Sequence, residues 1–156
     1  MSSRRLTERI LRIRELEEHE GRRALELALA ELAQLELALR TARQRERAGR
    51  NLVNASASSG DVADRIAGME ESRSSSRTAA ALTLRIRSAE NEVEKLRQQY
   101  LAQRTSRQQA EMLADSERER EEIAGLRRSQ RLLDDWYLNR KGPDEDPSDE
   151  DDIKNT

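Results

Sequence analysis

Apolar residues recur at alternating intervals of three and four in two long stretches of the chain, the pattern of helices that pack along one stripe. The first stretch carries this repeat at Leu25, Ala28, Leu32, Leu35, Leu39 and Ala42. The second carries it at Leu82, Ile86, Ala89, Val93, Leu96 and Tyr100, and the same phase continues through Gln103, Arg107 and Ala110. Because the two stripes are alike, we expect the two helices to pack on each other.

Breaks in this pattern predict where the helices begin and end. Gly49 and the small residues over 55–60 predict a loop, and Asp61 can cap the helix that follows. Gly142 and Pro143 predict the end of that helix. The sequence thus predicts a helix over about 3–48, a loop over about 49–60 and a helix over about 61–141.

These elements make residues 1–142 one all-α unit, a long antiparallel two-helix coiled-coil hairpin, followed by a disordered acidic tail over 143–156. The second helix would be a rod of about 120 Å. It exceeds the first by about 30 residues, or roughly 45 Å. One end of it should overhang, unless the serine-rich segment 72–78 is not helical, a question that the sequence leaves open.

The apolar stripe does not keep one phase along the whole chain. Its first positions are Leu6, Ile10 and Ile13. They match the later repeat only if the phase shifts over 16–23, where Gly21 lies, and we interpret this shift as a stutter that locally relaxes supercoiling. A second shift precedes a further stripe at Ile123, Leu126, Gln130, Leu133 and Tyr137.

Two surfaces of the predicted hairpin allow more than one interpretation. The segment 24–39 is apolar almost all round, with Leu27, Leu29 and Leu37 outside the main stripe. A third helix or a partner protein can cover this second face, or these leucines are scattered surface residues of a long rod. The amphipathic segment 6–16 can lie on a membrane surface, but packing against the C-terminal helix is favoured because the chain ends meet in such a hairpin.

Composition limits the chemistry and the location of the protein. The chain lacks cysteine, which excludes disulfides and thiolate metal sites, and no apolar run approaches the roughly 20 residues of a membrane span. The N-terminus has no uninterrupted apolar core of a secretory signal, and Glu8 and Glu15 argue against a transit peptide. We therefore expect a cytoplasmic protein without direct membrane insertion.

The net charge of −2 hides an uneven distribution. The tail from Pro143 holds seven acidic residues and one lysine, so the remaining 24 acids and 28 bases give the body a charge of +4. Bases alternate with acids through the body, as over 117–122, so we expect no basic stripe and no nucleic-acid binding. We hypothesise that the tail screens the basic body or regulates docking.

No residue pattern indicates catalysis. His19, the only histidine, lies among glutamates, and we interpret it as a solvated side chain rather than a metal ligand. The phosphate-binding loop, the dinucleotide-binding glycine motif and the zinc-protease motif are missing from the sequence. We expect no enzyme activity, no metal and no cofactor.

The most informative short stretch is 130–141, which holds the only tryptophan and two of the three aromatic residues. Trp136 and Tyr137 are adjacent, so on a helix they point about 100° apart and cannot share one seam. One can pack on the N-terminal helix near Leu6 or Ile10 while the other is left for a partner, as in a binding hot spot with a charged rim. Alternatively, the aromatic pair is a clamp that closes the hairpin.

This C-terminal stretch resembles the signature of the FliJ family of flagellar type III export and its injectisome stalk relatives. The matching residues are Gln130, Leu133, Asp134, Asp135, Trp136 and Arg140. The N-terminal pattern of Arg5, Leu6, Ile10, Leu11, Arg14 and Glu15 is also similar to the family. The resemblance covers residues 1–142, including the length, the hairpin and a glycine-containing loop near the middle.

The resemblance implies a non-catalytic stalk that sits in the ring of the export ATPase hexamer, promotes ring assembly and couples it to the export gate. The joined N- and C-terminal ends would enter the ring, and the other end would approach the cytoplasmic domain of the gate. Export chaperones are further implied partners, and the location would be the cytoplasm, at the periphery of the inner-membrane export apparatus. The implied ATPase-binding residues are Arg5, Leu6, Arg9, Asp134, Asp135, Trp136, Tyr137 and Arg140.

One departure from the family pattern concerns the gate end. Family members commonly carry aromatic residues near the loop, whereas this chain has none between Leu39 and Arg97, which weakens the expectation of gate docking there. The alternative function is that of a generic coiled-coil scaffold or adaptor in another cytosolic assembly.

Overall fold

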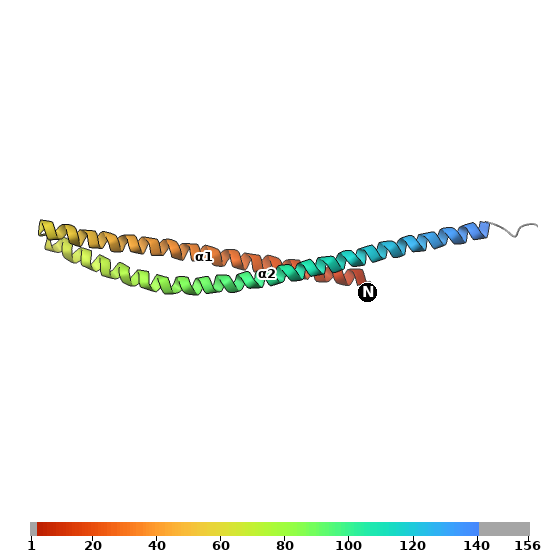
Figure 1. The fold of residues 1–156 in the computed structure, drawn as a ribbon, viewed down its shortest axis with the longest axis horizontal. Coiled ribbons are helices and arrows are strands. Elements are labelled where there is room, and N and C mark those ends of the chain that lie inside the picture. The colour runs from red at the N-terminus through yellow and green to blue at the C-terminus, as the bar shows by residue number, and fades with distance from the viewer. Residues whose placement is uncertain (1–2, 141–156) are drawn as a thin grey trace, which may run out of the picture.

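The computed structural model describes residues 3–140, which form two long helices, α1 (Ser3–Ser59) and α2 (Val62–Arg140). The helices run antiparallel and lie side by side as a hairpin (Figure 1). No strand occurs between residues 3 and 140. The predicted all-α hairpin is therefore confirmed, while the acidic tail over 143–156 lies outside the described residues.

A two-residue turn joins the helices. Gly60 adopts the left-handed backbone conformation, with φ of 75°, and its amide donates a hydrogen bond of 2.9 Å to the Ser56 carbonyl. Asp61 caps α2, because its Oδ1 accepts hydrogen bonds from the amides of Ala63 at 2.9 Å and Asp64 at 3.2 Å. The predicted cap is confirmed, but the predicted loop over 49–60 is wrong, since α1 continues to Ser59.

Small residues explain why the helix continues through the predicted loop. Gly49 and Ser56 on α1 and Gly68 and Ser75 on α2 are buried between the helices, at a spacing of seven residues on each. A Cβ atom added to Gly49 would lie 2.7 Å from the carbonyl oxygen of Gly68, so the two backbones are almost in contact here. Residues that signal a loop in the sequence thus form a close-packed helical tip, and the serine-rich segment 72–78 is helical.

The apolar core lies in the middle of the paired region. Leu35 and Ala42 of α1 pack with Leu82 and Ile86 of α2, and all four are at most 9% exposed. Partly buried residues surround this cluster: Leu32, Leu39, Ala79 and Ala89. The predicted stripes over 25–42 and 82–110 are confirmed, because every position in them is buried or half-buried. Burial of each large aliphatic side chain contributes about 1.5–3 kcal/mol.

Toward the open end of the hairpin polar side chains enter the seam, although Ala110 and Ala114 of α2 remain buried there. Gly21 faces Gln103, and Arg107 pairs with Glu18 across the helices. The first apolar stripe, at Leu6, Ile10 and Ile13, is 41–53% exposed and does not enter the seam. The predicted stutter is therefore wrong: the seam keeps the phase of its apolar part, and the first stripe turns outward.

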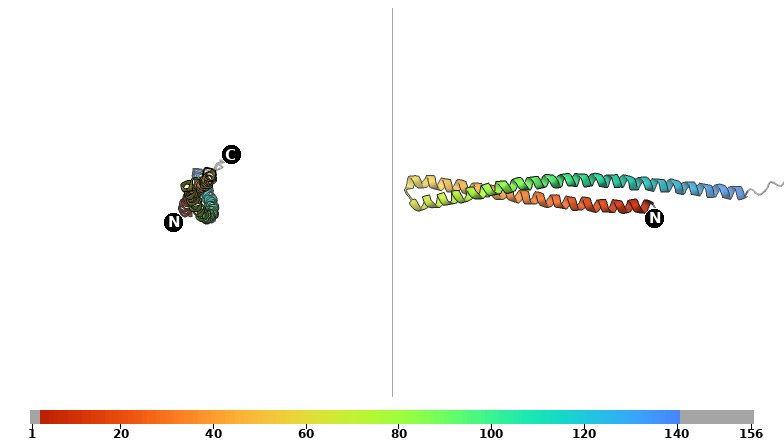
Figure 2. Two further views of the ribbon diagram at one scale, coloured as in Figure 1. Left: turned by 90° about the vertical axis from the view of Figure 1, so that its left-hand side faces the viewer. Right: turned by 90° about the horizontal axis from the view of Figure 1, so that it is seen from below.

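The two helices end unevenly at the open end. The Arg4 guanidinium lies 3.3 Å from the Glu121 carboxylate, so α1 begins opposite Glu121. From 122 to 140, α2 continues alone for about 28 Å (Figures 1 and 2). The predicted overhang is confirmed at the open end, but it is shorter than the roughly 45 Å expected, because α1 extends to Ser59.

Candidate partner-binding surface

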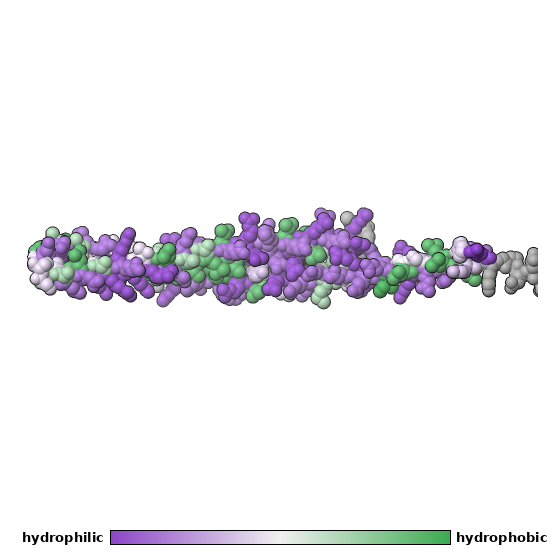
Figure 3. Space-filling view, turned by 90° about the horizontal axis from the view of Figure 1, so that it is seen from above, coloured by the Kyte–Doolittle hydropathy of each residue, from purple (hydrophilic) through white to green (hydrophobic). Residues whose placement is uncertain are grey.

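The single-helix end, defined here as residues 122–140, is exposed at every residue except the half-buried Ala124. It carries large apolar side chains that are 49–72% exposed, although no second helix covers them in the described part of the chain. Figure 3 shows apolar patches on this narrow end of a mostly hydrophilic surface. These side chains are Ile123, Leu126, Leu132, Leu133, Trp136, Tyr137 and Leu138. Such a density of exposed apolar side chains is typical of a protein-interaction surface.

An aromatic cluster occupies the last turns of this helix. The rings of Trp136 and Tyr137 stack edge-to-face, with centroids 5.2 Å apart and planes at 77°. The Arg140 guanidinium carbon lies 4.9 Å from the centroid of the Trp136 ring, a cation–π distance. Trp136 is 51% exposed and Tyr137 65% exposed, so neither ring is enclosed by the hairpin. The three side chains support one another and leave most of both rings open to a partner.

The predicted clamp between the aromatic pair and the N-terminal helix is wrong. Trp136 lies 15 residues beyond Glu121, which corresponds to about 22 Å along α2. The N-terminal helix begins beside Glu121 and cannot reach either ring, so packing of Trp136 or Tyr137 near Leu6 or Ile10 does not occur. The physical reason is the length difference between α1 and α2, which leaves the aromatic end unpaired.

The predicted site residues consequently fall into two separate groups. Arg5, Leu6 and Arg9 lie on α1, where its first turns pack beside the region of α2 that contains Arg118. The second group lies at the far end of α2: Asp134, Asp135, Trp136, Tyr137 and Arg140. The structure keeps the second group together on a few turns of one helix, and it does not bring the first group to it.

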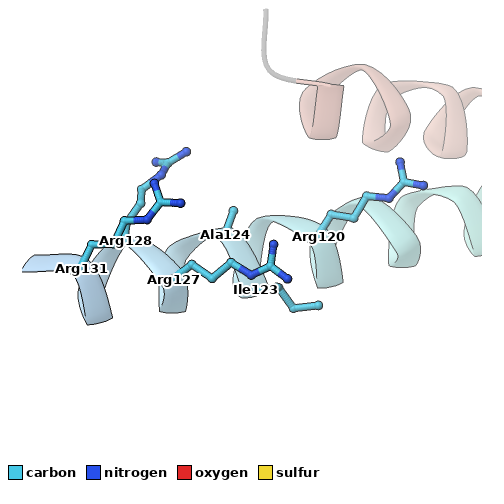
Figure 4. Close-up of a pocket in the computed structure, with 6 residues that line it drawn as sticks. All are labelled: Arg120, Ile123, Ala124, Arg127, Arg128 and Arg131. Atoms are coloured by element: carbon cyan, nitrogen blue, oxygen red, sulfur yellow. The ribbon is translucent and has the colours of Figure 1, made fainter. Parts of the chain in front are cut away.

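A second surface on the same helix was missed by the sequence analysis. Four arginines line a shallow groove around Ala124 and Ile123, and we call them the arginine face: Arg120, Arg127, Arg128 and Arg131 (Figure 4). In Figure 4, Arg120, Arg128 and Arg131 point to the side of α2 on which α1 lies. The expectation of no basic stripe is therefore wrong at this end of the chain. The sequence does indicate this basic surface, because the segment 123–133 holds three arginines and no acidic residue.

The arginine face lies opposite part of the apolar stripe, whereas Ile123 of that stripe borders the groove. At 100° per residue, all four arginines fall within about 60° of Ala124. By the same geometry, Leu126, Leu133 and Tyr137 fall about 140–180° away. The single-helix end thus presents a basic side and an apolar, aromatic side, which can contact different partners.

Most of the arginine face lacks carboxylate partners. Arg120 pairs with Glu117 of its own helix at 2.8 Å. Arg127, Arg128 and Arg131 form no ion pair with any residue in the range 3–140. Three uncompensated guanidinium groups within about 6 Å of helix length attract anionic groups.

Ion pairs hold the N-terminal end of α1 in register. Arg4 bridges Glu8 at 3.0 Å and Glu121 at 3.3 Å, and Arg118 approaches Glu8 at 3.7 Å. The hydrogen bond from Arg4, assisted by the positive charges of Arg4 and Arg118, lowers the pKa of Glu8 despite its partial desolvation. Hydrogen bonds to Glu8 and Glu121 in turn raise the pKa of Arg4. These contacts anchor α1 at the point where the single-helix end begins.

A second interhelical ion pair lies in the polar seam. Partial desolvation of the Arg107 guanidinium opposes its charge, but the carboxylates of Glu18 and Glu111 outweigh this effect and raise the pKa of Arg107. Gln103 is nearby in the seam, and its Oε1 is buried without a hydrogen-bond partner among the described residues. This part of the seam therefore combines an interhelical ion pair with an unpaired amide oxygen.

Comparisons with protein-family models, with curated proteins and with solved structures found no match to this chain. Within residues 3–140, histidine and acidic side chains form no group of three or more that could hold a metal ion. Neither described helix is long and apolar enough to span a membrane.

Proposed function

We propose that this chain is a non-catalytic coiled-coil stalk of a bacterial flagellar type III export apparatus. One structural observation carries the proposal: the residues that resemble the FliJ signature lie on a single helix that projects beyond the hairpin. Trp136 and Tyr137 are more than half exposed there, as anchors of a binding surface should be. The stalk would promote assembly of the export ATPase ring without hydrolysing nucleotide itself.

The uneven ends of the hairpin suggest how such a stalk would enter a ring. A single α-helix is about 10–12 Å wide with its side chains, whereas the paired region is about twice as wide. The single-helix end would insert into the central opening, and the ion-paired start of α1 would form a shoulder at the rim. Arg5 and Arg9, on that shoulder, would contact the rim rather than the interior of the ring.

The opposite end of the rod would approach the export gate. The sequence offers no aromatic residues there, but the tip exposes aliphatic side chains: Val62 is 67% exposed, Ile66 56% and Met69 40%. These side chains can supply an apolar contact with the cytoplasmic domain of the gate. Because the tip is closely packed around Gly49 and Gly68, the rod would transmit a displacement over about 118 Å, the length of α2. Its location would be cytoplasmic, at the periphery of the export apparatus, with export chaperones as further partners.

One observation favours the alternative of a general scaffold or adaptor. Leu27 and Leu37 on α1 are 72% and 59% exposed, and no element covers them in the described part of the chain. A partner helix that lay along this side of the rod would bury them. Such lateral binding would not require the single-helix end.

The test is affinity purification of the tagged chain from its native cells, followed by mass spectrometry. The test variant is Trp136→Ala with Tyr137→Ala, which removes the aromatic cluster. The matched control is Leu101→Ala with Met112→Ala, which removes two exposed apolar side chains, 51% and 73% exposed, from the paired part of the same helix. We expect the wild type and the control to recover a hexameric export ATPase, and the aromatic variant to lose at least about tenfold of it.

Two outcomes would contradict the proposal. Recovery of a different assembly, with no export component above background, would favour the scaffold function. Equal loss of the ATPase in the control variant would show that binding does not depend on the single-helix end. Circular dichroism of each variant would confirm that the helices remain folded.

A further inference from the structure

We propose that the acidic segment 144–152 of the same chain docks on the arginine face. This segment begins four residues after the last residue of α2 and contains seven acidic residues and no base. The arginine face carries positive charge without carboxylate partners close to this segment, because Arg127, Arg128 and Arg131 lack ion-pair partners within residues 3–140. The inference does not depend on the proposed function, since it concerns one chain alone.

The segment is long enough to fold back on the helix. The distance along α2 from Arg140 to Arg131 is about 14 Å, and the distance to Ala124 is about 24 Å. The eight residues 141–148 can span up to about 26 Å when extended. The acidic run 149–152 is therefore within reach of the arginines along the chain.

The chemistry of the groove fits this occupant in two respects. Its rim is formed by guanidinium groups, which bind carboxylates through paired hydrogen bonds. Its aliphatic floor is Ala124, with Ile123 at the border, and it can pack against Ile153, the residue that follows the acidic run. A purely basic surface would attract any anion, but the aliphatic floor favours a peptide that combines carboxylates with an apolar residue.

Docking in this position has a specific consequence for binding. The segment would cover the basic side of the single-helix end and leave the aromatic pair open, because Trp136 and Tyr137 lie about 120–140° around the helix from Ala124. Exposed ion pairs are individually weak, so the contact would be held mainly by the high effective concentration of a tethered segment. An acidic surface on a partner would have to displace the segment, and raised salt would weaken the self-contact.

The absence of cysteine in the chain allows a direct test with two engineered cysteine pairs. The test pair is Ala124→Cys with Ile153→Cys. The control pair is Ser129→Cys with Ile153→Cys, because Ser129 lies about 140° around the helix from Ala124. The control loop is five residues shorter, so a segment without a docking site would favour the control pair slightly. The measurement is the rate of intramolecular disulfide formation in the full chain at low and high salt.

We expect the test pair to close about fivefold faster than the control pair at low salt. The preference should disappear in about 0.5 M salt, where surface charges are screened within a few ångströms, and in the triple variant Arg127→Gln, Arg128→Gln and Arg131→Gln. Equal rates at low salt would overturn the proposal. A test-pair preference that survives the triple variant would also overturn it, because the arginines would then play no part.

Two further outcomes would contradict docking within one chain. Disulfides that form between chains, in proportion to protein concentration, would assign the arginine face to the acidic segment of a second copy. Tight, salt-sensitive binding of a nucleic acid that is unaffected by deletion of 143–156 would assign the face to that ligand instead.

Discussion

At the scale of single residues, Gly49 lies where the backbones of the two helices nearly touch, whereas Gly125 has open space around it. Replacing each by alanine should therefore have opposite effects on stability. We expect Gly49→Ala to lower the free energy of unfolding by about 1–3 kcal/mol, because the new Cβ would lie 2.7 Å from both the Gly68 carbonyl oxygen and the Ser72 amide nitrogen. Both atoms belong to the backbone and cannot move without separating the helices. Urea unfolding followed by circular dichroism measures the change.

Gly125 provides the matched control for this prediction. It lies in the single-helix end with nothing near its side-chain position, so Gly125→Ala should extend helical order and stabilise α2 locally by about 0.5–1 kcal/mol. If Gly49→Ala were as harmless as Gly125→Ala, the close approach of the helices at the tip would be wrong.

A second residue-scale prediction concerns acid. The pKa of Glu8 is lower in the folded chain than in the unfolded chain, so its contribution to stability is complete above the usual glutamate range, near pH 4.3, and is lost as the pH falls through the lower folded value. We expect Glu8→Gln to reduce the loss of thermal stability on going from pH 6 to pH 3. Nuclear magnetic resonance titration of the Glu8 carboxyl measures the pKa directly.

The control for the acid prediction is Glu20→Gln. Glu20 makes no ion pair with another residue between 3 and 140, so this variant should keep the pH dependence of the wild type. A Glu8 carboxyl that titrates at or above the usual glutamate range would refute the ion-pair cluster at the start of α1.

At the scale of elements, the two helices were predictable, but one of their boundaries was not. The apolar repeat over 25–42 and 82–110 determined the seam, and Asp61 determined the start of α2. The end of α1 was misplaced because Gly49 and the serines signal a loop by local preference, whereas here they allow two backbones to approach. Only the partner helix reveals this, since the same residues would not be stable as an isolated helix.

The single-helix end should be the least stable part of either helix. Isolated helices of this length are marginal in water, and 122–140 has no packed neighbour within the described chain. We expect amide hydrogen exchange there to be at least about tenfold faster than over 82–110, where the core lies. Uniform protection up to Arg140 would show that another element or a second chain covers this helix.

At the scale of the whole molecule, the register of the hairpin was beyond the reach of the sequence. The stripes at Leu6, Ile10, Ile13 and at Ile123, Leu126, Leu133 suggested that both ends of the chain share the seam. In the structure the side chains of both stripes are exposed. The heptad phase of the central seam continues toward the open end through the contacts Glu18–Arg107 and Gly21–Gln103, and the stripe residues lie outside that phase. The sequence therefore identified the residues of the candidate surface. It wrongly placed the group on α1, around Arg5 and Arg9, next to the group at the end of α2, around Trp136.

Distances between spin labels provide the test of this register. Ser3 lies opposite about residue 122, so a label at Ser3→Cys should be about 25–30 Å from one at Asn139→Cys, by helical rise and interhelical spacing. The same Ser3 label should be about 30–35 Å from one at Leu101→Cys, on the paired side. Pulsed electron paramagnetic resonance measures both distances in the same range.

The two distances respond in opposite directions to an error in register, which makes each the control for the other. A slip by one heptad would lengthen one distance and shorten the other by about 10 Å. If the chain ends were joined, the Ser3–Asn139 distance would fall to about 10–15 Å and the Ser3–Leu101 distance would rise to about 57 Å. That result would restore a hairpin with even ends, return the aromatic pair to the N-terminal helix, and remove the free helix on which both proposals depend.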